Sequence, residues 1–246
     1  MQTTFEATHS LDTIYDVLVI GAGQSGLATG YYLQRTPLTF AMLDKQSQIG
    51  GAWTHYYDNL KLFSPAKYAS LPGMDFPGDP DHYPSRNEVI AYLRDYADRF
   101  DLPVISDVQV TTVERNGDVF TLHTTRGESY LTRVLIAASG PFNTPKIPTI
   151  TGMESFNGEI LHSFDYKNPA PYHGQHVIVV GARESAMQIA ADLAPVARVT
   201  MAARRPLKFM PQHIFGKDIH FWLHSTGYDQ LPLGLFTELE GTERII

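Results

Sequence analysis

Cysteine is absent from this sequence of 246 residues. A chain without cysteine forms no disulfide bond, builds no zinc site from thiolates and performs no redox chemistry on a cysteine pair of its own.

Concentrated positive charge is lacking as well. Lys and Arg total 19 against 26 Asp and Glu, the formal net charge is −7, and no basic run occurs. Nucleic acids and acidic membranes bind through concentrated positive surfaces. No apolar run is long enough to span a bilayer, and residues 1–14 lack the features of a signal peptide. We expect no nucleic-acid partner, no membrane partner and a cytoplasmic location.

The composition that remains is typical of a globular protein. Apolar residues make up 43% and charged residues 18%, and the length suits two modest domains. Residues 15–20 form a short β-branched run that ends in glycine, residues 24–35 follow with helical spacing, and residues 38–44 form another apolar run. The order strand, Gly-rich turn, helix and strand predicts an α/β fold with a doubly wound sheet.

The middle of the chain predicts a long loop and then a helix. Residues 50–84 are rich in Gly, Pro and aromatic residues without a sustained period, which favours an ordered, functional loop. Ser85 and Glu88 form the capping-box pattern of a helix over residues 85–100. Its expected apolar face consists of Val89, Ile90, Leu93, Tyr96, Ala97 and Phe100.

Three alternating segments follow over residues 108–139. The turn signals Asn116-Gly117 and Arg126-Gly127 separate them and predict an antiparallel meander. The proline-rich residues 141–148 then predict a stiff connection between domains.

A second strand, turn and helix begins at His176, at an offset of 160 residues from the first. Its helix is expected to turn Ala186, Ile189, Ala190 and Leu193 inward. The repeat predicts two Rossmann-like dinucleotide-binding domains, over residues 14–144 and 145–246.

The first turn carries the dinucleotide fingerprint. Gly21 permits the tight turn, Gly23 lets backbone amides reach a pyrophosphate, and Gly26 allows close helix packing. Asp44 follows at the end of the next strand, where a carboxylate binds a ribose diol. A cluster of helix-capping glycines is the alternative, but it explains Gly26 without explaining the other three residues.

The second turn departs from the fingerprint. Arg183 stands where Gly23 was, and Ala186, a known variant, replaces Gly26. Arg204 lies 23 positions after Gly181, the spacing of Asp44 from Gly21, so a cation is expected in place of the carboxylate, and Arg205 adds a second. Guanidinium groups bind a 2′-phosphate that a carboxylate repels, which points to NADPH. The alternative is a solvated surface pair of arginines.

Two further motifs narrow the family. "GGAW" at residues 50–53 follows the Asp44 strand, and "FNGEILHSFDY" lies between the domains with Phe156, Gly158, His162 and Tyr166 at fingerprint spacing. The chain thereby resembles the flavin-containing and Baeyer–Villiger monooxygenases, from Asp16 to about Gly234. The resemblance implies a glutathione-reductase-like two-domain flavoprotein that takes FAD in its first site and NADPH in its second.

The resemblance and the two turns together give the expected cofactor-binding residues. For FAD these are Gly21, Gly23, Gln24, Ser25, Gly26, Asp44, Lys45, Gly51, Ala52, Trp53, Val110, Ala138 and Gly140. For NADPH they are Gly181, Arg183, Ser185, Arg204 and Arg205.

The chemistry that the resemblance implies is hydride transfer from NADPH to FAD, capture of O₂ as a flavin hydroperoxide, and oxygenation of a small organic substrate. His162 is expected to couple the two domains. The catalytic residue is not fixed by the sequence, and Asn59 and Ser64 are the candidates: an Asn of the family falls near Phe63 or Ser64 in this chain, while Asn59 lies slightly upstream. His220 and His224 lack a suitable third ligand, so no metal site is expected.

The resemblance also implies a returning segment that completes the FAD domain, and the chain stops before it. We therefore expect an FAD domain that is incomplete at its C-terminal side, or one completed by a partner, and a homo-oligomer is a further alternative. Two alternatives to a monooxygenase stay open, namely an NADPH-dependent flavoprotein reductase or oxidase and a non-catalytic accessory flavoprotein. The absence of cysteine excludes a disulfide reductase of the thioredoxin reductase type.

Overall fold

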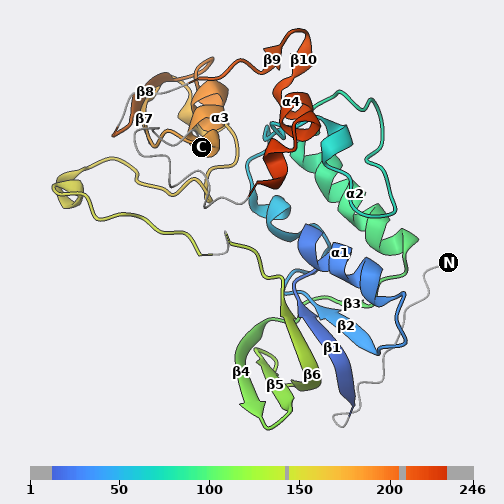
Figure 1. Ribbon diagram of the computed structural model, residues 1–246. Coiled ribbons are helices and arrows are strands. Elements are labelled where there is room, and N and C mark those ends of the chain that lie inside the picture. Colours follow the sequence, from blue (N-terminus) through green and yellow to red (C-terminus); the bar gives the residue numbers. More distant parts are fainter. Residues whose placement is uncertain (1–12, 142–143, 205–208, 232–246) are drawn as a thin grey trace.

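The protein is described by a computed structural model that covers residues 13–141, 144–204 and 209–231. Figure 1 shows a larger first part (residues 13–141), an extended linker (residues 144–175), a smaller second part (residues 176–204) and a C-terminal segment (residues 209–231).

The elements follow the strand and helix order that the sequence predicts. In the first part they are β1 (Ile14–Ile20), α1 (Gln24–Leu33), β2 (Phe40–Leu43), η1 (Gly51–His55), η2 (Ala66–Tyr68), α2 (Arg86–Arg99), β3 (Val104–Ile105), β4 (Val110–Asn116), β5 (Val119–Thr124) and β6 (Ser129–Ala137). The linker contains η3 (Met153–Ser155) and η4 (Ala170–Tyr172), and the second part contains β7 (His176–Val180), α3 (Glu184–Leu193) and β8 (Arg198–Ala202). The C-terminal segment contains β9 (His213–Ile214), β10 (Lys217–Asp218), α4 (Ile219–Ser225) and η5 (Tyr228–Gln230).

The main sheet has the strand order β3-β2-β1-β6-β5-β4. The first four strands run parallel, as β1 pairs with β2 and β6, and β2 with β3. In a parallel sheet the carboxyl ends of the strands share one edge, so the turn after β1 meets the ends of β2 and β6 there. The predicted α/β fold is confirmed.

The predicted meander is present, and its third strand has a second role. β4 pairs with β5 and β5 with β6, both antiparallel, while β6 also lies parallel to β1. The chain thus enters the meander at the outer edge of the sheet and returns through β6 to its centre. This return brings Ala138, directly after β6, next to the turn that follows β1.

Helix α2 holds the long loop of residues 50–84 in place within the first part. Ser85 and Glu88 form the predicted capping box, and the buried residues of the helix are Val89, Tyr92, Leu93, Tyr96 and Ala97. Tyr92 accepts a hydrogen bond from the Leu71 amide at 2.6 Å and donates one to the Met74 carbonyl at 2.6 Å. Because the tyrosines of α2 fix the loop backbone, the loop is ordered with little secondary structure of its own.

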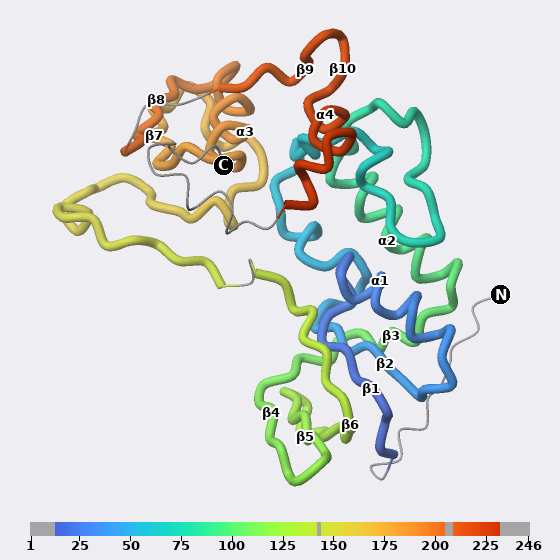
Figure 2. Tube along the Cα trace, viewed as in Figure 1, coloured from blue at the N-terminus to red at the C-terminus, as the bar shows by residue number. Residues whose placement is uncertain are grey.

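The second part repeats the first on a smaller scale. β7 and β8 form a parallel pair, and α3 connects them. Ile189, Ala190 and Leu193 are buried, as predicted, while Ala186 is half-buried. In Figure 2 the C-terminal segment runs from the second part to the first, and α4 lies beside the long loop. The rings of Phe63 and His220, 5.7 Å apart between centroids, mark that contact.

Candidate functional site: two dinucleotide turns and the joint between them

The first turn is shaped by two close approaches of backbone to backbone. Gly21 has a φ of +104°, and a Cβ placed there would lie 2.5 Å from the Ala138 carbonyl oxygen. A Cβ on Gly26 would lie 1.9 Å from the Gly21 carbonyl oxygen. Both distances are far below van der Waals contact, so neither position tolerates a side chain. The two glycines bring the start of α1 against the end of the sheet.

Gly23 fits the role of an anion-binding helix start. It is the N-cap of α1, it supplies no side-chain cap, and the first turn of the helix holds no acidic residue. The first N–H groups of a helix lack intrahelical partners and carry partial positive charge, which a pyrophosphate neutralises. The loop closes over this point, because a Cβ on Gly51 would lie 2.9 Å from the Cα of Gly23. The loop and the start of α1 therefore meet backbone to backbone at these two glycines.

Asp44 is buried at the carboxyl end of β2, with 6% of its surface exposed. One carboxylate oxygen accepts the Ala22 amide at 2.6 Å and the other accepts the Gln46 amide at 2.8 Å. The carboxylate therefore fixes the turn itself, in addition to the ribose-binding role that the sequence predicts. Each carboxylate oxygen retains further acceptor capacity for a diol.

The other residues predicted for FAD lie around the same edge of the sheet or next to it. Gln24, Ser25, Lys45 and Gly140 are exposed, and Ala52, Trp53, Val110 and Ala138 are half-buried. The Val108 amide donates to the Asp44 carbonyl at 2.8 Å, which holds the start of the meander beside Asp44. The structure brings these groups to one region, and their contact with FAD stays a prediction.

The second turn has the same hydrogen bonding with looser contacts. The Gly181 amide donates to the Ala202 carbonyl at 3.0 Å, as the Gly21 amide donates to the Leu43 carbonyl at 2.8 Å. The Cβ of Ala186 lies 3.2 Å from a Cβ placed on Gly181. The second turn thus accommodates alanine at the third position of the fingerprint, where the first turn has no space for a Cβ.

Arg183 caps α3 in an extended conformation, with φ −106° and ψ −179°, and makes no side-chain cap hydrogen bond. Its backbone is ordinary for any residue, so the replacement of glycine strains nothing. The difference lies in the exposed guanidinium beside the helix start. Ser185 is exposed in the same helix turn.

The strand register corrects one sequence-based expectation. Ile20 pairs with Leu43, whereas Val180 pairs with Ala202, so the second connection is one residue shorter than the first. The position equivalent to Asp44 is therefore Ala203, and Arg204 corresponds to Lys45. Equal spacing from the glycine suggested that a cation replaces the carboxylate. Instead, the carboxylate is lost and the cation follows one residue later.

Arg204 is exposed two residues beyond the end of β8. It lies close to the Gly181 turn, because Ala202 accepts the Gly181 amide. Arg205 falls outside the described residues. The assignment of Arg204 to a 2′-phosphate stays a prediction.

The two parts meet at a shared apolar cluster. Its buried members are Tyr57, Leu60, Tyr166, Ile189 and Leu193. These residues come from the loop of the first part, the linker and α3 of the second part. We call this cluster the joint, because it connects the three. Burial among these groups raises the pKa of Tyr57 to about 12, so its hydroxyl stays protonated at neutral pH.

Two of the predicted functional residues have structural partners at this joint. The Asn59 side chain donates to Asp192 of α3 at 2.6 Å. His162 is half-buried, and its Nδ1 accepts the Phe164 amide at 3.1 Å within the linker. Tyr166 of the same linker motif is the residue that reaches α3, because its hydroxyl donates to Asp192 at 2.6 Å. Ser64 is half-buried in the loop beyond.

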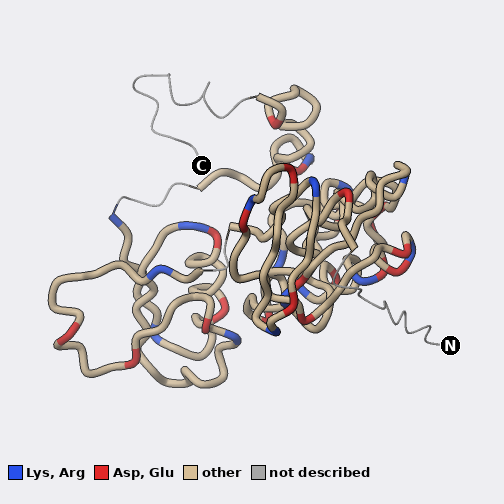
Figure 3. Tube along the Cα trace, turned by 90° about the horizontal axis from the view of Figure 1, so that it is seen from below, with Lys and Arg blue, Asp and Glu red and all other residues tan. Residues whose placement is uncertain are grey.

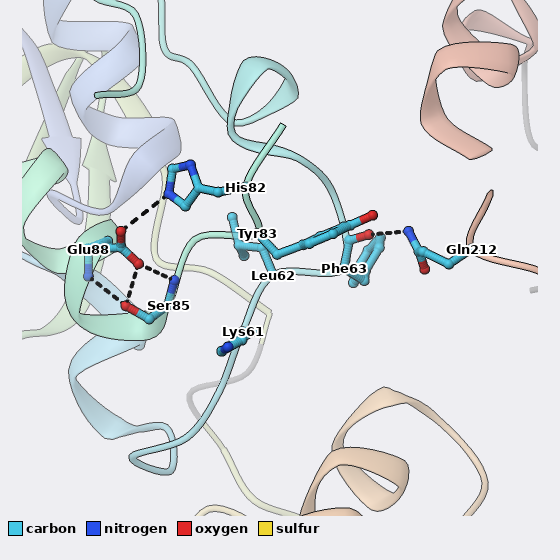
Figure 4. Close-up of a pocket in the computed structure, with 8 residues that line it drawn as sticks. All are labelled: Lys61, Leu62, Phe63, His82, Tyr83, Ser85, Glu88 and Gln212. Atoms are coloured by element: carbon cyan, nitrogen blue, oxygen red, sulfur yellow. Dashed lines mark hydrogen bonds and ion pairs between the residues drawn. The ribbon is translucent and has the colours of Figure 1, made fainter. Parts of the chain in front are cut away.

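A pocket of about 780 Å³ lies beside the joint (Figure 4). Its lining residues are Lys61, Leu62, Phe63, His82, Tyr83, Ser85, Glu88 and Gln212. Figure 4 shows Phe63 and Tyr83 next to Gln212, which donates to the Phe63 carbonyl at 3.1 Å. The pocket therefore has an aromatic wall at the contact between loop and C-terminal segment.

Asp218 organises that contact from behind the pocket. It accepts hydrogen bonds from the hydroxyl of Tyr83, from Gln212 at 2.8 Å, and from both the amide and Nδ1 of His220 at 2.8 Å. Burial opposes ionisation of Asp218, but these donors outweigh it and lower the pKa of the carboxyl group. Within the described ranges no group of three or more His, Cys, Asp or Glu residues is placed to hold a metal ion.

The sequence model of the family described as pyridine nucleotide-disulphide oxidoreductase matches residues 18–224. The chain belongs to this family. Its sequence is 39% identical over 216 residues to an uncharacterized CzcO-like oxidoreductase of Geobacillus kaustophilus, a match that covers 87% of this chain and 61% of the relative.

Among solved structures, monooxygenases are similar to this chain. A flavin-containing monooxygenase from Stenotrophomonas maltophilia superposes with a TM-score of 0.78 at 37% identity, covering 85% of this chain and 63% of that one. A steroid monooxygenase bound to NADP superposes with a TM-score of 0.67 at 27% identity, covering 89% of this chain and 43% of that one. The predicted resemblance to flavin-containing monooxygenases is confirmed, and the chain spans less than two thirds of these proteins' length.

Two further findings concern membrane-spanning helices and the distribution of charge. No helix among the described residues is long and apolar enough to cross a membrane. Figure 3 shows Lys and Arg interspersed with Asp and Glu along the chain.

Sequence reasoning missed the residues of the joint. Gln188 and Asp192 are polar, lie four residues apart on α3 and border its buried face. That spacing was the available signal, since residues four apart share one helix face.

Proposed function

We propose that this protein is a cytoplasmic FAD-dependent monooxygenase that uses NADPH and O₂ to oxygenate a small organic substrate. The observation that carries the proposal is the pair of turns with equivalent amide-to-strand hydrogen bonds and different charges at the ribose end, Asp44 at one and Arg204 at the other. The similarity to flavin-containing and NADP-bound monooxygenases supports it.

The residues of the first turn fit an adenine dinucleotide. The open N–H groups at the start of α1 would hold the pyrophosphate of FAD, and Asp44 would accept the ribose hydroxyls. The close approach of Gly51 to Gly23 holds the loop against the N-terminus of α1, where the pyrophosphate would bind.

The second turn would take NADPH. Arg183 and Ser185 flank the start of α3, and Arg204 is exposed near the same turn. A guanidinium binds a phosphate dianion bidentately, so Arg204 is the residue that would separate NADPH from NADH. We assign residues 14–144 to FAD and residues 145–246 to NADPH.

When bound, the two cofactors supply hydride transfer and activation of O₂. The contribution of the chain is to hold the two nucleotides at a fixed separation and to limit the access of water. The apolar joint around Tyr57 and Tyr166 serves the first task, and the aromatic wall of Phe63 and Tyr83 serves the second.

A reductase or oxidase that passes electrons to O₂ without oxygenating a substrate is the second candidate. The engagement of Asn59 by Asp192 favours it, because that amide is held in the joint. A non-catalytic flavoprotein would bind flavin and leave NADPH unoxidised.

The experiment is to purify the protein, record its flavin absorbance and follow NADPH oxidation together with peroxide. A yellow protein that oxidises NADPH and forms an oxygenated product from an added amine, sulfide or ketone supports the monooxygenase. Peroxide equal to the NADPH consumed, with every such substrate, supports the oxidase. A colourless protein that does not oxidise NADPH contradicts both.

A further inference from the structure

One face of α3 is bonded directly to the long loop of the first part. Gln188 and Asp192, four residues apart on this face, each contact the loop between Asn59 and Lys61. The contacts are between residues more than 120 positions apart in sequence.

Gln188 pairs with the loop as a neighbouring strand would. Its Oε1 accepts the Lys61 amide at 3.2 Å, and its Nε2 donates to the Lys61 carbonyl at 3.0 Å. Both backbone groups of one residue are thus satisfied by one side chain. A carboxylate in its place would lose the donor, and an aliphatic side chain would lose both bonds.

Asp192 anchors the same face one helix turn later. It accepts Asn59 at 2.6 Å and the Tyr166 hydroxyl at 2.6 Å. Beneath these polar contacts Ile189 and Leu193 pack on Tyr57 and Leu60. The apolar packing gives the contact its stability, and the Gln188 pair fixes its register along the loop.

The helix and the loop each lead to a different functional region. α3 begins at Arg183, in the turn predicted to bind NADPH. The loop continues from Lys61 into Leu62 and Phe63, which line the pocket. Gln188 therefore links α3 directly to the segment of the loop that forms the pocket wall.

We propose that Gln188 is a positioning residue that transmits nucleotide occupancy at the start of α3 to the loop around Lys61. The proposal rests on the proposed function only in taking NADPH as the ligand of the second turn. Asn59, which the sequence placed among the catalytic candidates, belongs to the same contact.

The test uses NADP⁺ as the probe and the exchange rate of the Lys61 amide hydrogen as the readout, which needs no turnover. In the wild-type protein saturating NADP⁺ should slow this exchange by about fivefold or more, the lower end of common coupling strengths. In Gln188→Leu the exchange should be fast and insensitive to NADP⁺, while the NADP⁺ Kd rises by no more than the coupling factor measured in wild type, because coupling is reciprocal. Gln188→Glu keeps the acceptor and loses the donor, so it should show an intermediate response and serves if the leucine variant does not fold.

Gln175→Leu is the matched control. Gln175 is exposed and lies in the linker directly before β7, and its side-chain amide donates to the Pro171 carbonyl at 3.0 Å. It should respond to NADP⁺ as wild type does. Binding of NADP⁺ with no change at Lys61 in wild type, or with an unchanged response in Gln188→Leu, overturns the coupling alone. Failure of the wild type to bind NADP⁺ overturns the proposed function and the coupling together.

Discussion

The two turns have the same hydrogen-bonded framework and differ in how tightly their atoms approach. In the first, Gly26 meets the Gly21 carbonyl at a distance that excludes any Cβ, whereas in the second Ala186 is accommodated. The first turn therefore requires glycine at the third position of the fingerprint, and the second turn does not. The second turn was free to change sequence because its packing does not depend on glycine at the second and third positions.

The largest expected effect comes from Gly26→Ala. The new methyl group would overlap the Gly21 carbonyl, so the turn must move, and we expect a loss of about 3 kcal/mol in the free energy of unfolding together with loss of flavin binding. Ala186→Gly is the matched change in the second turn and should cost about 1 kcal/mol or less. Urea denaturation and flavin absorbance measure both. Equal losses in the two variants would contradict the difference in packing.

Arg204→Ala tests the difference in charge. Loss of a charge-assisted hydrogen bond costs about 1.5–3 kcal/mol, so the Kd for NADPH should rise by about 10- to 100-fold while the Kd for NADH changes little. Arg198→Ala, at the opposite end of β8, is the control. Fluorescence titration with both nucleotides gives the ratio of the two Kd values. An equal change in the Kd for NADPH and for NADH would show that Arg204 does not bind the 2′-phosphate.

Asp218→Asn tests how much the buried carboxylate of the C-terminal segment contributes to stability. The donors around Asp218 lower its pKa in the folded state, so its contribution to stability is complete above the unfolded pKa near 4 and is lost as the pH falls below that value. The variant should lose about 1–3 kcal/mol in the free energy of unfolding at pH 7. The difference from wild type should shrink below about pH 4 in denaturant titrations. A difference that stays constant down to pH 3 would show that the charge of Asp218 contributes nothing.

Arg183→Gly should have the smallest effect. The backbone there is unstrained, and an exposed charge contributes about 1 kcal/mol or less, so NADPH and NADH should both bind about threefold more weakly. Titrations at low and high salt measure this, and the effect should fade at high salt. Tighter binding in the variant would mean that the arginine side chain blocks the pyrophosphate.

The parts of the fold that the sequence predicted depend on local chemistry. The capping box of Ser85 and Glu88 and the order of strand, turn and helix involve residues a few positions apart, so their patterns are legible in one sequence. The register at Arg204 could not be predicted from the sequence in this way, because it depends on the length of the connection between α3 and β8. The pairing of Gln188 with Lys61 depends on how two distant segments pack, and no local pattern encodes it.

Asp44 joins the stability of the first turn to the proposed binding of a cofactor. Its two oxygens accept the amides of Ala22 and Gln46, one on each side of the edge where the nucleotide is expected. The carboxylate therefore shapes the turn through contacts within the chain, in addition to its proposed contact with a ribose. Replacement of Asp44 should accordingly disturb the backbone of the turn as well as the affinity for flavin.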